Sequence, residues 1–210
     1  MFRDERRELC KQRIIETAFA AFLENGIEMT NITSIAQNSK VPERSLYRYF
    51  TTKEELVTQT YYWYWGMLSD RIKGALSTTE FEQKNGLAQV DFILRLLADT
   101  LFFDPRVMVL AQEVDLFLMK DKSSRYTALH EDDYAVFLVP ISASLSRGVA
   151  DGSIRRDIDI ENAYHTASSG LFGIMQELAF QNPDRSLIES DAIEQINTYC
   201  LMVGKYLRAE

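Results

Sequence analysis

The sequence contains few cysteines, histidines, prolines and glycines, and each shortage narrows the class of protein. Its two cysteines, Cys10 and Cys200, lie near opposite ends of the 210-residue chain and form neither a disulfide framework nor a metal motif. Four prolines and nine glycines leave few helix breakers, so long helices are expected. The chain has no run of the roughly 18 apolar residues that a membrane span needs. Residues 2–13 also lack the apolar core of a signal peptide, so we expect reduced thiols in a cytoplasmic protein.

The formal net charge of −8 is unevenly distributed along the chain. Residues 1–60 contain nine basic and nine acidic side chains, whereas residues 61–210 contain 14 basic and 22 acidic ones. A pI near 4.9 argues against nucleic-acid binding by the chain as a whole. Any polyanion would therefore have to bind the N-terminal part.

The sequence gives little support to an enzyme. A di-iron helical bundle needs Glu-x-x-His pairs, but the chain has two histidines and Glu161 stands four residues before His165. We find no nucleophile elbow, P-loop or paired Cys and His, so we expect no catalytic residue, no cofactor and no resident metal. The His-Glu-Asp-Asp run at 130–133 could bind a divalent cation, but such a run is more typical of a solvated surface.

Apolar residues recur at helical spacing almost throughout, and no alternating strand pattern is present, so we predict an all-α fold of about nine helices. Asn25-Gly26 should end the first helix, Asn31 should cap the second, and Thr51-Thr52 should cap the fourth. Pro140 should kink or split the seventh helix. The predicted helices are 3–25, 31–39, 43–50, 53–76, 87–103, 106–120, 124–150, 160–181 and 187–208.

Residues 31–50 have the pattern of a helix-turn-helix motif. Arg44 and Arg48 are four residues apart, with Tyr47 on the same side of the second helix. Four cations and one anion lie between Lys40 and Lys53, a charge balance that suits DNA phosphates, and arginine can also pair with guanine edges. Two arginines alone would indicate only a solvated face; the complete pattern favours DNA. The apolar positions that should hold the two helices together are Ile32, Ile35, Ala36, Val41, Leu46 and Phe50.

The segment from Arg13 to Leu56 resembles the DNA-binding domain of the TetR family of transcriptional repressors. It contains IIETAFAAFLENGIEMTNITSIA and VPERSLYRYFTTKEEL, with a Leu-Tyr-x-x-Phe recognition helix followed by Lys-Glu-x-Leu. The matching residues are Gly26, Thr30, Ile35, Ala36, Leu46, Tyr47, Tyr49, Phe50, Lys53, Glu54 and Leu56. The resemblance implies a three-helix DNA-binding domain over 1–52 and a helical effector-binding and dimerisation domain over 53–210.

The resemblance also implies roles for individual DNA-binding residues. Bases should be near Pro42, Glu43, Arg44 and Ser45, and phosphates near Thr33, Ser34, Tyr47, Tyr49 and Lys53, while Arg48 suits either. Lys40 stands where the family commonly has glycine, and a left-handed turn there would cost lysine about 1 kcal/mol more than glycine. The turn either differs or keeps Lys40 for a phosphate. Glu43 is also unusual, and it would either accept from cytosine N4 or repel phosphate.

The YYWYW run at 61–65 raises the question of an effector pocket. Five consecutive helical residues point all round the axis, so they cannot share one core. We expect one face to pack on the first helix and another to line a pocket, although any single aromatic is more typical of core packing. His165 is likewise more typical of a buried, hydrogen-bonded histidine. The predicted pocket residues are Trp63, Tyr64, Met67, Phe102, Phe103, Met108, Gln112, Phe117, Tyr134, Phe137, His165, Phe172 and Met175.

The last two helices carry the predicted dimer interface, Ala163, Ala167, Gly170, Gly173 and Ile174. The resemblance implies a four-helix bundle across a two-fold axis, and packing within the protomer is the alternative. We therefore expect a homodimeric regulator, by family a repressor, that binds a palindromic double-stranded DNA operator. A small apolar or aromatic effector would release it. Two alternatives remain: a co-regulator that acts through protein contacts, and a repressor that responds to no ligand.

Overall fold

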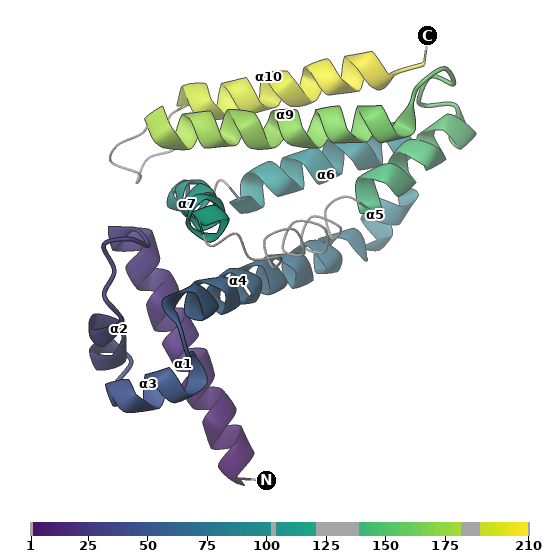
Figure 1. Ribbon diagram of the computed structural model, residues 1–210. Helices are drawn as coiled ribbons and strands as arrows, with labels where there is room; N and C mark the ends of the chain where they lie inside the picture. The colour runs from purple at the N-terminus through teal and green to yellow at the C-terminus, as the bar shows by residue number, and fades with distance from the viewer. Residues whose placement is uncertain (1, 102–103, 121–138, 182–189, 210) are drawn as a thin grey trace. The chain divides into compact units, whose positions relative to one another are not determined.

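The computed structural model describes residues 2–101, 104–120, 139–181 and 190–209. Every regular element in these ranges is a helix, apart from one antiparallel bridge between Ile154 and Arg208, which confirms the predicted all-α fold (Figure 1). None of the described helices is both long and apolar enough to cross a membrane. The named helices are α1 (Phe2–Asn25), α2 (Ile32–Asn38), α3 (Glu43–Tyr49), α4 (Lys53–Leu76), α5 (Thr79–Gln83), α6 (Gly86–Leu101), α7 (Arg106–Lys120), α9 (Ile160–Gln181) and α10 (Ser190–Leu207).

Residues 139–151 are also helical and form the described part of the predicted helix 124–150. The earlier part of that predicted helix, and with it the His-Glu-Asp-Asp run at 130–133, lies outside the described residues. By packing, the chain divides into two compact units. The first combines Met1–Met67 with Leu110–Thr127, and the second combines Leu68–Val109 with Ala128–Glu210. This division cuts α4 and α7 partway along. The domain boundary at 52/53 that the family resemblance implies stays a prediction.

The first unit is built on α1. In Figure 1, α2 and α3 lie beside α1, and α2 packs on both α1 and α3. The interior is apolar and closely packed, because the side chains that recur every three to four residues all point toward it. Its fully or almost fully buried residues include Ile14, Ala18, Phe22, Ile35, Leu46, Phe50 and Leu56. Of these, Ile35, Leu46 and Phe50 were predicted from the sequence pattern to hold the second and third helices together.

The aromatic run on α4 divides between packing and surface. Phe19 of α1 stacks on Tyr64 with ring centroids 4.6 Å apart and meets Trp63 edge-on at 5.5 Å. Tyr61 and Trp65 are buried, whereas Tyr62 is 38% exposed. The prediction that one face of the run packs on the first helix is therefore confirmed.

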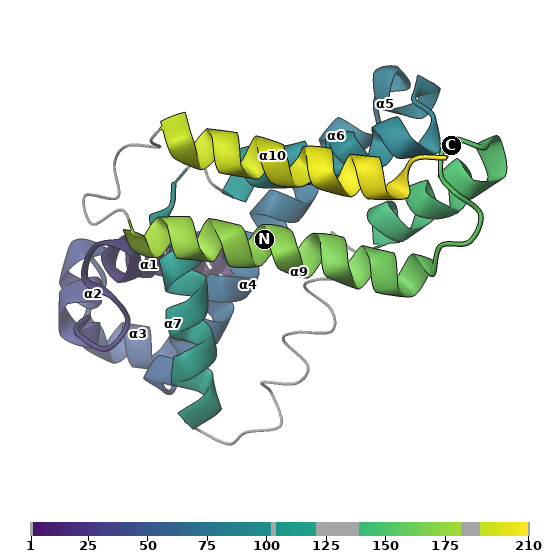
Figure 2. The ribbon, with the colours of Figure 1, turned by 90° about the horizontal axis from the view of Figure 1, so that it is seen from above.

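In the second unit, α9 and α10 run side by side in opposite directions, and α6 packs against both (Figures 1 and 2). Leu97, Leu171 and Met175 are fully buried in its interior. Cys200 is buried there as a free thiol, and burial raises its pKa.

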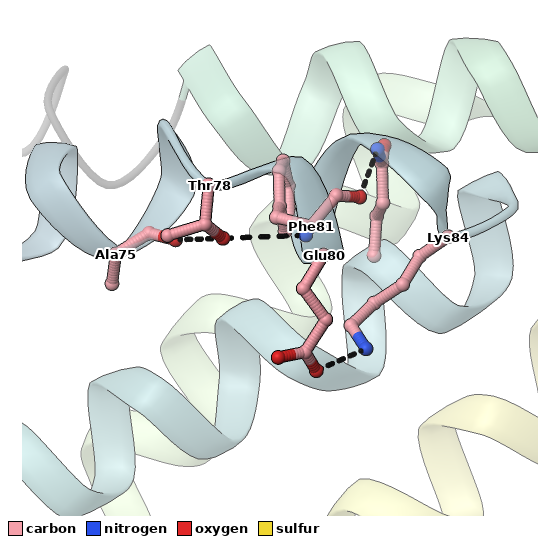
Figure 3. Close-up of polar contacts among 6 residues, drawn as sticks. Ala75, Thr78, Glu80, Phe81 and Lys84 are labelled. Carbon is pink, nitrogen blue, oxygen red and sulfur yellow. Dashed lines mark hydrogen bonds and ion pairs between the residues drawn. The ribbon is translucent and has the colours of Figure 1, made fainter.

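Helix α5 was missed from the sequence. It has only five residues, too short to show a periodic apolar pattern. Thr78 caps it: the hydroxyl accepts from Phe81 N–H at 3.3 Å and donates to the Ala75 carbonyl at 3.0 Å (Figure 3). A Glu80–Lys84 ion pair at 3.0 Å spans its outer face. Its cap and its contacts with the rest of the protein stabilise this short helix. Neither produces a hydrophobic repeat that could be read from the sequence.

Candidate DNA-binding site

Helix α2 begins at a capped N-terminus. The Asn31 side chain accepts from the Thr33 N–H at 2.9 Å, as predicted for a capping asparagine. The Ser34 hydroxyl donates to the Asn31 carbonyl at 2.7 Å and still has acceptor capacity. Thr33 is half-buried and Ser34 is exposed, so both predicted phosphate contacts lie near the surface at the start of the helix.

The turn between α2 and α3 is left-handed at Lys40, which has φ of +55°. The Val41 N–H donates to the Ala36 carbonyl at 3.0 Å, and the Lys40 N–H donates to the Gln37 carbonyl at 3.0 Å. This pair of hydrogen bonds defines a Schellman motif, with Lys40 in the position that normally takes glycine. The turn therefore keeps the geometry that a glycine would give, and lysine bears the strain.

Helix α3 turns one face inward and the other to the surface. Leu46 is 1% exposed and anchors the helix, and Phe50 directly after it is fully buried. Pro42 precedes the first turn, and its carbonyl accepts from Ser45 N–H at 2.7 Å. The predicted base-proximal and phosphate-proximal residues are then presented outward: Pro42, Glu43, Arg44, Tyr47 and Arg48 are exposed, and Ser45 and Tyr49 are half-buried.

The cations on this face have few competing partners. Among the residues that the structure describes, neither Arg44 nor Arg48 forms an ion pair with a carboxylate. The Arg48 guanidinium lies over the Tyr49 ring, 5.5 Å from its centroid. Guanidinium groups without a carboxylate partner remain available to bind phosphates or base edges.

A cationic groove beside α3 was missed from the sequence. It has a volume of about 650 Å³ and is lined by Asp4, Arg6, Arg7, Cys10, Arg48 and Tyr49. Three arginines against one aspartate make it electropositive. The sequence shows basic residues near the start of the chain. Because acidic residues are interspersed with them, the sequence alone did not indicate which face of α1 carries the arginines.

Lys53 lies in a different environment from the one predicted. Its ammonium donates to the Thr30 carbonyl at 2.8 Å and to the Glu28 carbonyl at 3.4 Å. It also lies over the Phe117 ring, 5.9 Å from the centroid. A phosphate contact would require this ammonium to leave or share those partners.

The predicted pocket residues are distributed over both units. Trp63 and Tyr64 pack on Phe19 of α1, and Phe117 lies under Lys53. Met108 and Met175 are buried in packing, Met67 is 49% exposed, and Gln112 and Phe172 are half-buried. Phe102, Phe103, Tyr134 and Phe137 lie outside the described residues.

His165 corrects an expectation. It is exposed rather than buried and hydrogen-bonded, and its ring lies 4.7 Å from the ring of Tyr164. Tyr164, its neighbour, is the buried one, and burial raises its pKa to about 12. The spacing of apolar residues in the sequence did not show which of the adjacent Tyr164 and His165 is buried.

The small residues of α9 pack largely within the protomer. Ala163 and Ala167 are buried, and a Cβ on Gly170 would overlap the Tyr199 side chain. The Tyr199 hydroxyl donates to the Thr166 and Ala167 carbonyls at 3.0 Å each. Of the predicted interface residues, Gly173 is exposed and Ile174 is half-buried. Ile174 borders a groove with Met202 of α10, which is 63% exposed.

The fold and this surface define a helix-turn-helix DNA-binding regulator. Residues 14–60 match the family model for "Bacterial regulatory proteins, tetR family". The chain is 24% identical over 155 residues to the HTH-type transcriptional repressor KstR2 of Mycobacterium tuberculosis (strain ATCC 25618 / H37Rv), covering 72% of each protein. Residues 14–60 therefore carry a DNA-binding domain of the tetR type, and the chain as a whole is similar to a transcriptional repressor that has such a domain.

Solved structures of low sequence identity share the whole fold. FadR from Bacillus subtilis, in complex with stearoyl-CoA, matches with a TM-score of 0.70 at 16% identity, over 94% of this chain and 99% of that one. A TetR transcription regulator from Haloarcula marismortui ATCC 43049 matches with a TM-score of 0.75 at 16% identity, over 95% and 97%. The names of the family and of its relatives indicate regulation of transcription rather than catalysis.

Proposed function

We propose that this protein is a homodimeric repressor that inserts α3 of each protomer into the major groove of a palindromic operator. The observation that carries the proposal is the α2–α3 unit itself. A Schellman turn fixes α3, Leu46 and Phe50 anchor it, and Arg44 and Arg48 are exposed without a carboxylate partner in the described chain. The repressor name of KstR2 supports the direction of regulation.

The DNA-binding surface has three parts in this proposal: residues that read bases, residues that contact phosphates, and a cationic groove. Arg44 and the neighbouring Glu43 and Ser45 read bases, and Tyr47, Tyr49 and the α2 hydroxyls position the phosphates. Lys40 reaches a phosphate from the turn. The cationic groove of Arg6, Arg7 and Arg48 extends this surface along the DNA backbone.

Dimerisation through α9 and α10 is supported by apolar side chains that the protomer leaves uncovered. Leu201, Met202 and Tyr206 of α10 are each more than half exposed. Met202 and Ile174 border one groove with a volume of about 480 Å³. Exposed apolar side chains on a helix suit an isologous helix-packing interface, in which a second copy would cover them.

An effector with a long apolar part and a hydrogen-bonding group is the ligand that we propose. In the described part of the chain, Thr60 Oγ1 and Gln112 Oε1 are buried without a hydrogen-bond partner. Such orphaned groups are costly, and a ligand that pairs with them offsets the cost. FadR, which shares the fold, was solved with stearoyl-CoA, so acyl-CoA thioesters are the first compounds to screen.

The test is fluorescence anisotropy with the DNA upstream of the protein's own gene, at several salt concentrations. Wild type should prefer this DNA, or a site recovered by random-sequence selection, over scrambled DNA, with a steep salt dependence. The Arg44→Ala/Arg48→Ala variant should lose both the preference for this DNA and the steep salt dependence of binding. If neither source of DNA yields a preferred site, repression through DNA fails, and a co-regulator acting through protein contacts takes its place.

A further inference from the structure

The loop between α1 and α2 determines where the helix-turn-helix begins. Gly26 ends α1 in the left-handed region, with φ of +77°, and Ile27 beside it is buried. The buried Thr30 hydroxyl donates to the Gly26 carbonyl at 2.6 Å and to the Ala21 carbonyl at 3.2 Å. The next residue, Asn31, caps α2. Any displacement of this loop therefore moves the N-terminus of α2, and with it α3.

A carboxylate from α7 holds the first part of the loop. Glu113 Oε2 accepts the Ile27 N–H at 2.9 Å, although the residues are 86 positions apart. A Cβ on Gly26 would lie only 3.1 Å from Glu113 Oε2 and 3.2 Å from Oε1, so the carboxylate fits closely against this glycine. An N–H bonded to a charged acceptor is among the stronger hydrogen bonds of a protein. Gly26 thus suits both the left-handed conformation and the close approach of the Glu113 carboxylate.

The last part of the loop is held one helical turn further along α7. Phe117 follows Glu113 by four residues, so the two share one face of the helix. Its ring lies 5.9 Å from the Lys53 ammonium, which donates to the Thr30 and Glu28 carbonyls. Lys53 is also the first residue of α4. One face of α7 therefore contacts the start of the loop directly and its end through Lys53.

We propose that Glu113 and Phe117 are positioning residues for operator binding, and that Lys53 acts with them inside the protein rather than as a phosphate ligand. This inference rests on the DNA-binding function proposed above. Glu113 and Phe117 touch no DNA. They fix the loop that orients α2 and α3, so breaking these contacts would change the orientation of the recognition helix. The segment of α7 that carries both residues belongs to the same compact unit as α1–α3.

The salt dependence of DNA binding distinguishes positioning from phosphate contact. A lost phosphate contact reduces the slope of log K against log salt by about 0.9 per site, or about 1.8 for a dimer. A lost positioning contact lowers affinity and leaves the slope unchanged. We expect Glu113→Ala, Phe117→Leu and Lys53→Met each to weaken binding of the preferred operator roughly tenfold, about 1.4 kcal/mol, with the wild-type slope. For Glu113→Ala this direction is opposite to simple electrostatics, because removing an acidic group near DNA should strengthen binding.

Two further variants serve as controls. Glu113→Gln keeps an oxygen that can accept the Ile27 N–H and should recover most of the affinity, which a nonspecific charge effect would not. Asp70→Asn removes an exposed carboxylate of α4 and should bind as wild type does. Hydrogen exchange at the Ile27 amide adds a direct readout, with protection lost in Glu113→Ala and kept in Glu113→Gln.

The outcomes separate this inference from the function on which it rests. If wild type prefers no DNA, both fail. If wild type binds its operator and Glu113→Ala and Phe117→Leu match it, only the positioning role fails. If Lys53→Met alone loses about 1.8 of the salt slope, Lys53 contacts phosphate and its assignment here is wrong.

Discussion

The carboxylate of Asp151 accepts the backbone N–H of Gly86 at 2.8 Å, across 65 positions of sequence. Its other oxygen accepts the Ser153 N–H at 2.9 Å, and the Ser153 hydroxyl accepts the Leu87 N–H at 3.1 Å. Two otherwise unpaired donors in the first turn of α6 are therefore satisfied from a distant turn. Gly86 has no side chain where a Cβ would overlap the Gly148 backbone, so the helix start and the 139–151 helix lie in close contact.

This relationship predicts a pH-dependent contribution to stability. Hydrogen bonds from Ser153 and from the Gly86 N–H lower the pKa of Asp151 from its ordinary value of 3.8. A carboxylate with a lowered pKa stabilises the folded state above that ordinary value, and the contribution is lost as the pH falls through the folded-state pKa. Asp151→Ala should therefore lower Tm at pH 7, and its difference from wild type should shrink in acid.

Thermal melts at several pH values check this prediction, with Asp70→Ala as a matched loss of an exposed acidic side chain. Asp70→Ala should leave Tm close to that of wild type. A Tm difference for Asp151→Ala that stays constant over the acidic range in which both proteins remain folded would contradict the role of its charge.

Variants of Lys40 separate the cost of its left-handed backbone conformation from its proposed contact with a DNA phosphate. Lys40→Gly should stabilise the protein by about 0.5–1 kcal/mol, because it removes a left-handed conformation from a residue with a Cβ. The greater freedom of glycine in the unfolded chain offsets part of the gain. Urea unfolding measures this effect. The same variant should reduce the salt slope of operator binding, and Lys40→Ala, which keeps the strain and removes the charge, should reduce the slope without the gain in stability.

Much of the fold could be predicted because its helix boundaries have local chemical causes. Asn31 caps α2, Pro42 precedes α3, and Gly26 ends α1 in the left-handed region. Each of these residues acts on its own backbone, so its effect is visible in the sequence. Helix α5 has a local cap as well, but a five-residue helix shows no periodicity, and Gln89 secures it by donating to the Phe81 carbonyl from α6.

The site was less predictable where the role of a residue depends on its contacts with parts of the chain that are distant in sequence. Sequence spacing placed Ala163 and Ala167 on one face of α9, and that face turns toward the interior of the protomer. The family pattern marked Lys53 as important, but the sequence could not show that two carbonyls and an α7 ring surround it. Exposed α3 residues were predictable because amphipathic spacing alone separates Leu46 from Arg44 and Arg48.

The proposed dimer interface predicts the effect of one charge. Met202→Glu should convert the dimer into a monomer at micromolar concentration, because it places a carboxylate among exposed apolar side chains that a partner would cover. Size-exclusion chromatography with light scattering gives the mass directly. Met29→Glu is the matched control, since Met29 is 83% exposed and lies in the loop before α2. A Met202→Glu protein that remains dimeric would exclude this part of α10 from the interface.

The cationic groove predicts a second contribution to the salt dependence of operator binding. Arg6→Ala/Arg7→Ala should reduce the slope of log K against log salt by up to about 1.8 per protomer, since each lost phosphate contact contributes about 0.9. Discrimination between the operator and scrambled DNA should change little, because phosphate contacts carry no direct base information. Arg71→Ala/Arg156→Ala removes two exposed cations of the second unit and controls for the change in overall charge. If both double variants reduce the slope equally, the effect belongs to net charge. If only the groove variant does, the first turns of α1 contact the DNA backbone next to the recognition helix.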